Sequence, residues 1–223
     1  MKSIFGVLLA SLATAALSAM PIVARAGEIF VIVGDNNGAS GEYDATTGAA
    51  INPFLVGNVS PGVPSAIAAS GSDQFASAGI TGTIGEYTNS GATVNASFIT
   101  GLPPLNGNSL AVSGGDLFVA NTDGTIGEYD ATTGATVSAS LVTGLNGPQG
   151  IAVSGGDLFV TNGNIGTVGE YTTSGALVDA SLVTGLGFPA GIAVVPTPEP
   201  SAWVMLVIGG LALLVCGHRR QAV

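Results

Sequence analysis

The sequence contains almost no basic residues. Its four Lys and Arg residues are Lys2, Arg25, Arg219 and Arg220, so residues 27–218 carry none, whereas all fourteen Asp and Glu residues fall within that stretch. Nucleic-acid binding is therefore excluded, because phosphate contact requires a basic surface. Salt bridges within the stretch are excluded too, so each carboxylate must be solvated, hydrogen-bonded by the backbone or bound to a cation.

Cysteine and histidine are nearly absent as well. The single cysteine, Cys216, and the single histidine, His218, both lie close to the C-terminus. This excludes a disulfide framework and a Ser-His-Asp triad from the preceding part of the chain. Acid–base chemistry there would fall to Asp, Glu or Tyr, so we expect no catalytic residue and no enzyme. Paired carboxylates that hydrolyse glycosides are an alternative that composition leaves open.

The N-terminus reads as a secretory signal peptide. Lys2 precedes an apolar run from Ile4 to Leu17, and Ala24 and Ala26 form a small-residue cleavage pattern. We expect residues 1–26 to be removed on export, with an uncleaved anchor as the alternative.

The C-terminus combines a proline-rich segment, an apolar run and a basic end. Residues 196–201 form an extended linker, because its prolines continue neither a helix nor a strand ladder. Residues 202–217 carry no charge and, as a helix, span about 24 Å of a hydrocarbon core about 30 Å thick. Residues 218–223 form a basic tail, which the positive-inside rule places in the cytoplasm. The sequence thus predicts one short transmembrane helix.

This C-terminus resembles the PEP-CTERM sorting signal of Gram-negative bacteria. The resemblance covers residues 195–223 and rests on a proline-glutamate motif and a terminal arginine pair: Val195, Pro196, Pro198, Glu199, Pro200, Arg219 and Arg220. It implies recognition by an exosortase, a membrane protease-transpeptidase that removes the tail, in a cell that makes extracellular polysaccharide. A plain C-terminal anchor is the alternative.

The middle of the chain, residues 27–195, consists of four copies of one unit. The tripeptide Gly-Glu-Tyr recurs with spacings of 44, 42 and 42 residues, and its tyrosines are all those of the protein: Tyr43, Tyr87, Tyr129 and Tyr171. Each copy divides into four short apolar runs separated by turn residues such as Gly114-Gly115. A repeat of this length with four strands is typical of a β-propeller blade. We therefore predict an all-β propeller of four blades, each of about 42 residues.

The first copy lacks its first strand. The mature chain would begin at Gly27, which aligns with a second strand, whereas residues 191–195 align with the first strand at 150–154. We predict that residues 191–195 complete the N-terminal blade and close the ring, which removes its exposed sheet edges. Closure of four blades in one chain is the favoured outcome, with a dimeric eight-bladed ring or an open arc as alternatives.

The repeat text, with GPQGIAV, DLFVTN and VGEY in the fourth copy, resembles NHL-type and streptogramin-lyase-type propeller repeats over residues 27–195. The lyases depend on a histidine and a divalent metal, and this region has no histidine, which argues against carrying their activity over.

Two sets of carboxylates recur once per copy. One lies at the turn into the second strand and the other in the third strand: Glu28, Asp73, Asp116 and Asp157, and Glu42, Glu86, Glu128 and Glu170. In a closed ring each set could surround the channel with oxygens suited to Ca²⁺. The favoured interpretation is that they are hairpin corners and solvent-facing strand residues. The tyrosines are likewise expected to pack between blades rather than stack on carbohydrate.

These observations predict an exported, non-enzymatic propeller, first anchored in the inner membrane and then released to the cell surface or extracellular matrix. Its expected partners are an exosortase-type enzyme and exopolysaccharide or another surface protein, with no cofactor unless Ca²⁺ binds. The alternative function is a metal-dependent lyase or hydrolase acting on an extracellular substrate.

Overall fold

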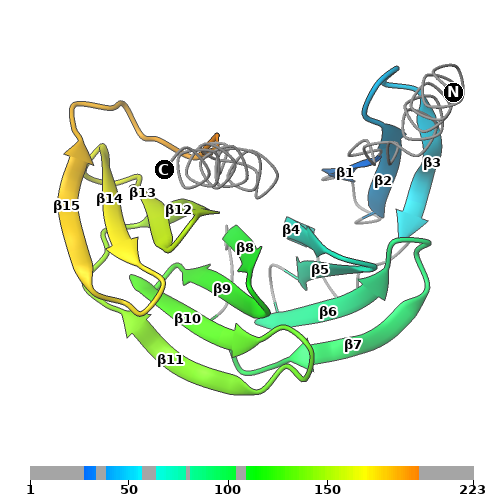
Figure 1. Cartoon of the computed structure of the whole chain (residues 1–223), viewed down its shortest axis with the longest axis horizontal. Coiled ribbons are helices and arrows are strands. Elements are labelled where there is room, and N and C mark those ends of the chain that lie inside the picture. The colour runs from blue at the N-terminus through cyan, green and yellow to red at the C-terminus, as the bar shows by residue number, and fades with distance from the viewer. Residues whose placement is uncertain (1–27, 34–38, 57–63, 79–80, 104–108, 196–223) are drawn as a thin grey trace, which may run out of the picture. The chain divides into compact units, whose positions relative to one another are not determined.

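The computed structural model describes residues 28–33, 39–56, 64–78, 81–103 and 109–195. Every regular element in these ranges is a β-strand (Figure 1). The chain divides into two compact units, Met1–Asn106 and Gly107–Val223, which are considered separately below.

The first unit contains two antiparallel sheets. The first sheet has three strands, in the order β1-β2-β3, and the second has four, in the order β4-β5-β6-β7. The strands are β1 (Glu28–Val33), β2 (Ala39–Asp44), β3 (Ala50–Val56), β4 (Pro64–Ser70), β5 (Asp73–Ala78), β6 (Thr83–Thr88) and β7 (Thr93–Ile99).

The second unit contains two four-stranded sheets, ordered β8-β9-β10-β11 and β12-β13-β14-β15. Their strands are β8 (Ser109–Ser113), β9 (Asp116–Asn121), β10 (Thr125–Asp130), β11 (Thr136–Val142), β12 (Pro148–Ser154), β13 (Asp157–Asn162), β14 (Thr167–Thr172) and β15 (Leu177–Val183). Each sheet is a meander in which consecutive strands pair antiparallel, which is the topology of a propeller blade. The predicted all-β class, the repeat and the strand division are confirmed.

The turn chemistry explains why each copy folds into a meander. Gly114 and Gly115 connect β8 to β9 with φ values of 65° and 102°, a region that residues with a side chain rarely adopt. Alternation of apolar and polar residues then assigns each strand two faces. The tyrosine of the third strand lies on one, here called the tyrosine face, and the preceding glutamate lies on the other, called the glutamate face.

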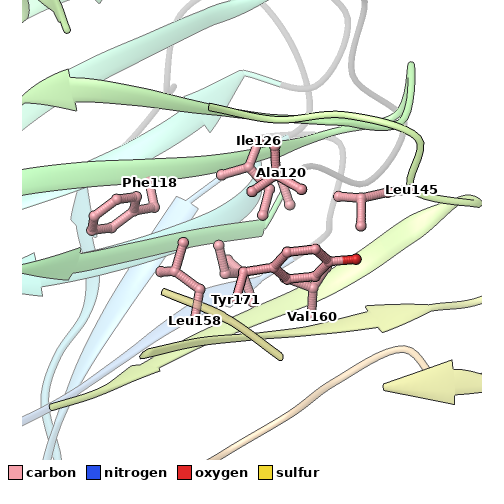
Figure 2. Packing of buried hydrophobic residues seen from close by; sticks show 9 residues of the cluster. Phe118, Ala120, Ile126, Leu145, Leu158, Val160 and Tyr171 are labelled. Atoms are coloured by element: carbon pink, nitrogen blue, oxygen red, sulfur yellow. The ribbon is translucent and has the colours of Figure 1, made fainter. Parts of the chain in front are cut away.

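Neighbouring sheets bury a core between unlike faces. In the second unit, Phe118, Ile126 and Val142 on the glutamate face of the third sheet share one buried cluster with Leu158 and Val160 on the tyrosine face of the fourth (Figure 2). The first unit repeats the arrangement on a smaller scale, with Val56 of β3 in one cluster with Ala76 of β5. The same junction therefore occurs twice.

The closing strand is not among the described strands. Residues 191–195 are described but are not assigned to a strand, and the first sheet has three strands rather than four. The residue just before this segment contacts the fourth sheet, because the Thr161 hydroxyl donates a hydrogen bond of 3.2 Å to the Ala190 carbonyl oxygen.

Candidate functional site

The Gly-Glu-Tyr motif has a packing role that its geometry makes clear. The glycine lies two residues before the tyrosine on the same face of the strand, so the ring folds back over the glycine. A Cβ atom at Gly169 would come 2.9 Å from Cε2 and 3.1 Å from Oη of Tyr171. The other glycines of the motif meet their own tyrosines in the same way: Gly41, Gly85 and Gly127. The ring position therefore requires glycine rather than any larger residue.

The tyrosines fill the junctions between sheets. Figure 2 shows Tyr171 of β14 beside Val160 and below Ile126 and Ala120, and all four residues belong to one buried cluster. Tyr87 of β6 occupies the matching place in the first unit, packed with Leu55 and Val56 of β3. Burial raises the pKa of both phenols above its ordinary value. These two tyrosines thus act as core residues, as the sequence favoured, and their ring faces are not open to a sugar.

The glutamates of the motif are more enclosed than solvent-facing residues would be. Glu42 and Glu86 are each only 8% exposed, so the prediction of a solvent-facing strand position is wrong for them. The reason is that each glutamate lies opposite a phenylalanine of the second strand, Phe30 and Phe75 respectively. Glu128 is half-buried.

Glu86 and Glu128 each have an aspartate near them on the same face of the sheet. Burial, and then the negative charge of Asp73, raise the pKa of Glu86. Burial and Asp116 raise the pKa of Glu128 in the same way. The second and third sheets therefore each hold one pair of carboxylates, and the two negative charges of a pair repel each other because no basic residue lies in this part of the sequence.

Two carboxylates are too few ligands to form a metal site. Among the residues that the structure describes, no three His, Cys, Asp or Glu side chains gather closely enough to hold a metal ion. In the fourth sheet Asp179 lies opposite Glu170. Its Oδ1 already accepts a 2.8 Å hydrogen bond from the Ser181 amide. The side chain of Glu28, the first member of the other predicted set, lies outside the described residues.

Asp44 and Asp130 use their carboxylates to build turns. Asp130 Oδ1 accepts hydrogen bonds from the amides of Thr132 and Thr133 at 3.0 and 2.7 Å, and from the Thr133 hydroxyl at 2.8 Å. These bonds hold the pKa of Asp130 below its ordinary value, and equivalent bonds do the same for Asp44. The repeated sequence DATTG was the available signal for this role.

Most residues of the predicted processing sites lie outside the described part of the chain. These are Ala24 and Ala26 of the cleavage pattern, and Pro196, Pro198, Glu199, Pro200, Arg219 and Arg220 of the sorting motif. Within the described ranges, the structure has no helix long and apolar enough to cross a membrane. Val195 is described, and it is 88% exposed.

The sequence matches no family model and no curated protein. Three solved structures similar in fold are the computationally designed Ika8 and Ika4 proteins and BamB from Moraxella catarrhalis. Their TM-scores are 0.48, 0.44 and 0.48, at 18%, 16% and 17% identity. The matches cover 74%, 60% and 77% of this chain, and 50%, 81% and 51% of those chains, so this chain spans about half of Ika8 and of BamB. Likeness at this level carries no conclusion about ligand, partner or activity.

Proposed function

We propose that this protein is an exported, non-enzymatic β-propeller of the cell surface or extracellular matrix, delivered there by its C-terminal sorting signal. The observation that carries the proposal is the order of features after the fourth sheet. A proline-glutamate motif, an uncharged run and an arginine pair follow one another in residues 195–223. The exposure of Val195 supports access to the motif, because a processing enzyme must reach its first residue.

The non-enzymatic role is supported by the chemistry of residues 27–195. This region has no His, Cys, Lys or Arg, so a reaction there would depend on carboxylates, phenols, hydroxyls and amides. Asp44 and Asp130 are engaged in turn hydrogen bonds, and Glu86 and Glu128 each lie near an aspartate of like charge. The surface is acidic and rich in hydroxyl groups, which suits hydrogen bonding to neutral polysaccharide. An acidic polysaccharide would be repelled unless Ca²⁺ bridged it to the protein.

We also propose that the repeats form a closed ring. Residues 189–195 align with β12, the inner strand of the fourth sheet, and they lie next to it: a Cβ at Gly150 would come 3.3 Å from Cγ2 of Ile192. In a ring, the inner strand of the next sheet would lie in this position beside β12. In the proposed ring, residues 191–195 supply the inner strand that β1-β2-β3 lacks.

Substitution of the motif tests the delivery step. We expect the triple variant Pro198→Ala, Glu199→Ala, Pro200→Ala to accumulate in the membrane fraction at its unprocessed length. Pro53→Ala, in an exposed part of β3, is the matched control and should be processed normally. Equal processing of the triple variant and the wild type would refute the sorting role.

A further inference from the structure

An exposed aromatic ring with an unusual backbone conformation lies at one end of the fourth sheet. Phe188 is 62% exposed, and its φ of 52° makes it the one non-glycine residue with positive φ among those described. The equivalent residue of the third copy is Gly147, with a φ of 65°. The fourth copy therefore places a phenylalanine where the backbone favours glycine, although the ring is not buried. Backbone strain of this kind is typical of functional sites.

Two loops of the second unit form the surface beside this ring. They lead from β11 into β12 and from β13 into β14, and they are residues 143–147 and 163–166. The Gly163 amide donates a hydrogen bond of 2.8 Å to the Gly147 carbonyl oxygen, and the Asn164 amide donates one of 3.3 Å to the Asn146 carbonyl oxygen. The Asn146 amide donates a bond of 3.0 Å to Oδ1 of Asn162. These bonds fix the two loops against each other, so a ligand would meet a surface that is already formed.

The ring and two amide side chains lie close to the paired glycines of these loops. A Cβ at Gly163 would lie 3.4 Å from Cε2 of Phe188 and 3.0 Å from Cγ of Gln149. A Cβ at Gly147 would lie 2.7 Å from Cγ of Asn164. Because the two glycines are joined by a hydrogen bond, the aromatic ring and both amide side chains gather on one small area of the surface.

The asparagines of this area keep hydrogen-bonding groups for a ligand. Asn164 Nδ2 donates a hydrogen bond of 3.1 Å to Asn146 Oδ1, and both residues are exposed. A side-chain amide has two N–H donors and one carbonyl acceptor. The bond between the two amides therefore leaves Nδ2 of Asn146 as a donor and Oδ1 of Asn164 as an acceptor for other partners.

The segments that form this area carry no charge. Residues 143–149, 163–166 and 184–190 contain no Asp, Glu, Lys, Arg or His, although the chain has fourteen carboxylates. A charged ligand would find no oppositely charged partner in these segments, whereas an aromatic ring with neutral amides suits a ligand that is apolar on one face and polar at its edge. The pyranose ring of a neutral sugar has this character, because its C–H groups can stack on an aromatic ring while its hydroxyls bond to amides.

We propose that this area is a binding site for a neutral polysaccharide, with one pyranose ring stacked on the aromatic side chain. The residues of the site are Phe188, Asn146, Asn164 and Gln149. All of them belong to the second unit, so the site does not depend on closure of the propeller. The inference deepens the proposed surface role, on which it rests, by assigning a binding site to it.

Calorimetric titration of the full-length chain, in a detergent without a sugar headgroup, tests the class of ligand. The neutral probes are cellohexaose, maltohexaose and mannohexaose. The acidic probe is hexamannuronate, which matches mannohexaose in linkage and ring stereochemistry but carries a carboxylate on every sugar. We expect at least one neutral probe to bind and hexamannuronate not to bind, because the chain has a net charge of −10. Binding of no neutral probe, or equal binding of mannohexaose and hexamannuronate, would overturn the proposal.

The variant Phe188→Gly separates binding from folding. It removes the ring and supplies the residue that the third copy has at this position, so the affinity for the neutral probe should fall about tenfold or more with no decrease in melting temperature. Asn164→Ala should also weaken binding. Phe54→Ala is the matched control, because Phe54 is 67% exposed in β3 and should not affect the affinity. Unchanged affinity of Phe188→Gly would overturn the proposal, and so would a lower melting temperature, which would show that the ring packs within the folded chain.

Tail processing in the native host gives a separate result for sorting. Phe188→Gly should be cut at the C-terminal motif like the wild type, because the motif itself is unchanged. Loss of sugar binding with normal processing would support the site, whereas an uncut wild-type chain that still binds the neutral probe would refute sorting alone.

Discussion

Replacing Gly169 by alanine should destabilise the protein although it removes no contact. The added Cβ would lie 2.9 Å from Cε2 of Tyr171, well inside the ordinary carbon–carbon contact distance of about 3.5–4.0 Å. The ring is 8% exposed and packed among Val160 and Ile126, so it cannot move freely. Overpacking of this kind costs about 1–3 kcal/mol. Expulsion of the whole ring would set the upper limit at about 3–5 kcal/mol.

The assay is urea unfolding followed by circular dichroism, with Gly156→Ala as the matched control. Gly156 has no atom within 4 Å of its Cβ position and no positive φ, so alanine there should be neutral or stabilise by up to about 1 kcal/mol. In a Tyr171→Ala background the Gly169→Ala cost should disappear, which a double-mutant cycle measures as coupling. Equal stability of Gly169→Ala and Gly156→Ala would refute the packing role of the motif.

Three further predictions concern stability. Gln74→Leu should raise the free energy of unfolding in urea by about 1–2 kcal/mol, because the buried Oε1 of Gln74 has no hydrogen-bond partner. The equivalent positions in the third and fourth copies are leucine. A loss of stability would contradict this prediction. The pKa values of Glu86 and Glu128 are raised in the folded protein, so the free energy of unfolding should increase as pH falls from 7 through these folded pKa values. The pKa values of Asp44 and Asp130 are lowered in the folded protein, so the stability that these residues contribute should be lost below about pH 3.8. The melting temperature should therefore be highest at weakly acidic pH, and Glu86→Gln should reduce its increase between pH 7 and that maximum. A melting temperature that falls steadily as pH is lowered from 7 would contradict this prediction. CaCl₂ should raise the melting temperature no more than MgCl₂ of equal ionic strength, and a Ca²⁺-specific rise would restore the carboxylate-ring hypothesis.

The strands could be predicted because their signals are local. Glycine pairs and the DATTG turns mark where each strand ends, and near-identical text in the third and fourth copies shows which strands correspond. The packing role of the tyrosines was also predictable, since an aromatic residue repeated once per sheet belongs at a repeated junction. Local spacing, however, could not show that the ring folds over its own glycine.

Burial across a junction could not be predicted from one strand. Gln74 looks like a surface residue in sequence but is 1% exposed, because the neighbouring sheet covers its face. Glu42 and Glu86 were misjudged because the pattern within one strand does not show the phenylalanine that lies opposite each of them on the paired strand. Phe188 aligns with Gly147 of the preceding copy, but the sequence does not show that it keeps the positive φ of that glycine, 52° against 65°. The proposed pairing of residues 191–195 with the first sheet would join segments far apart in sequence, which local patterns do not encode.

The central claim is that the chain is cut at its C-terminal motif and acts outside the cell. The most direct measurement is the intact mass of the mature protein recovered from its native host, taken separately for the membrane and extracellular fractions. The account predicts an extracellular species that begins near Gly27 and ends near Pro200, bare or carrying an added group. A mass that extends to Val223 and occurs only in the membrane fraction would contradict it and would indicate a tethered receptor-like protein.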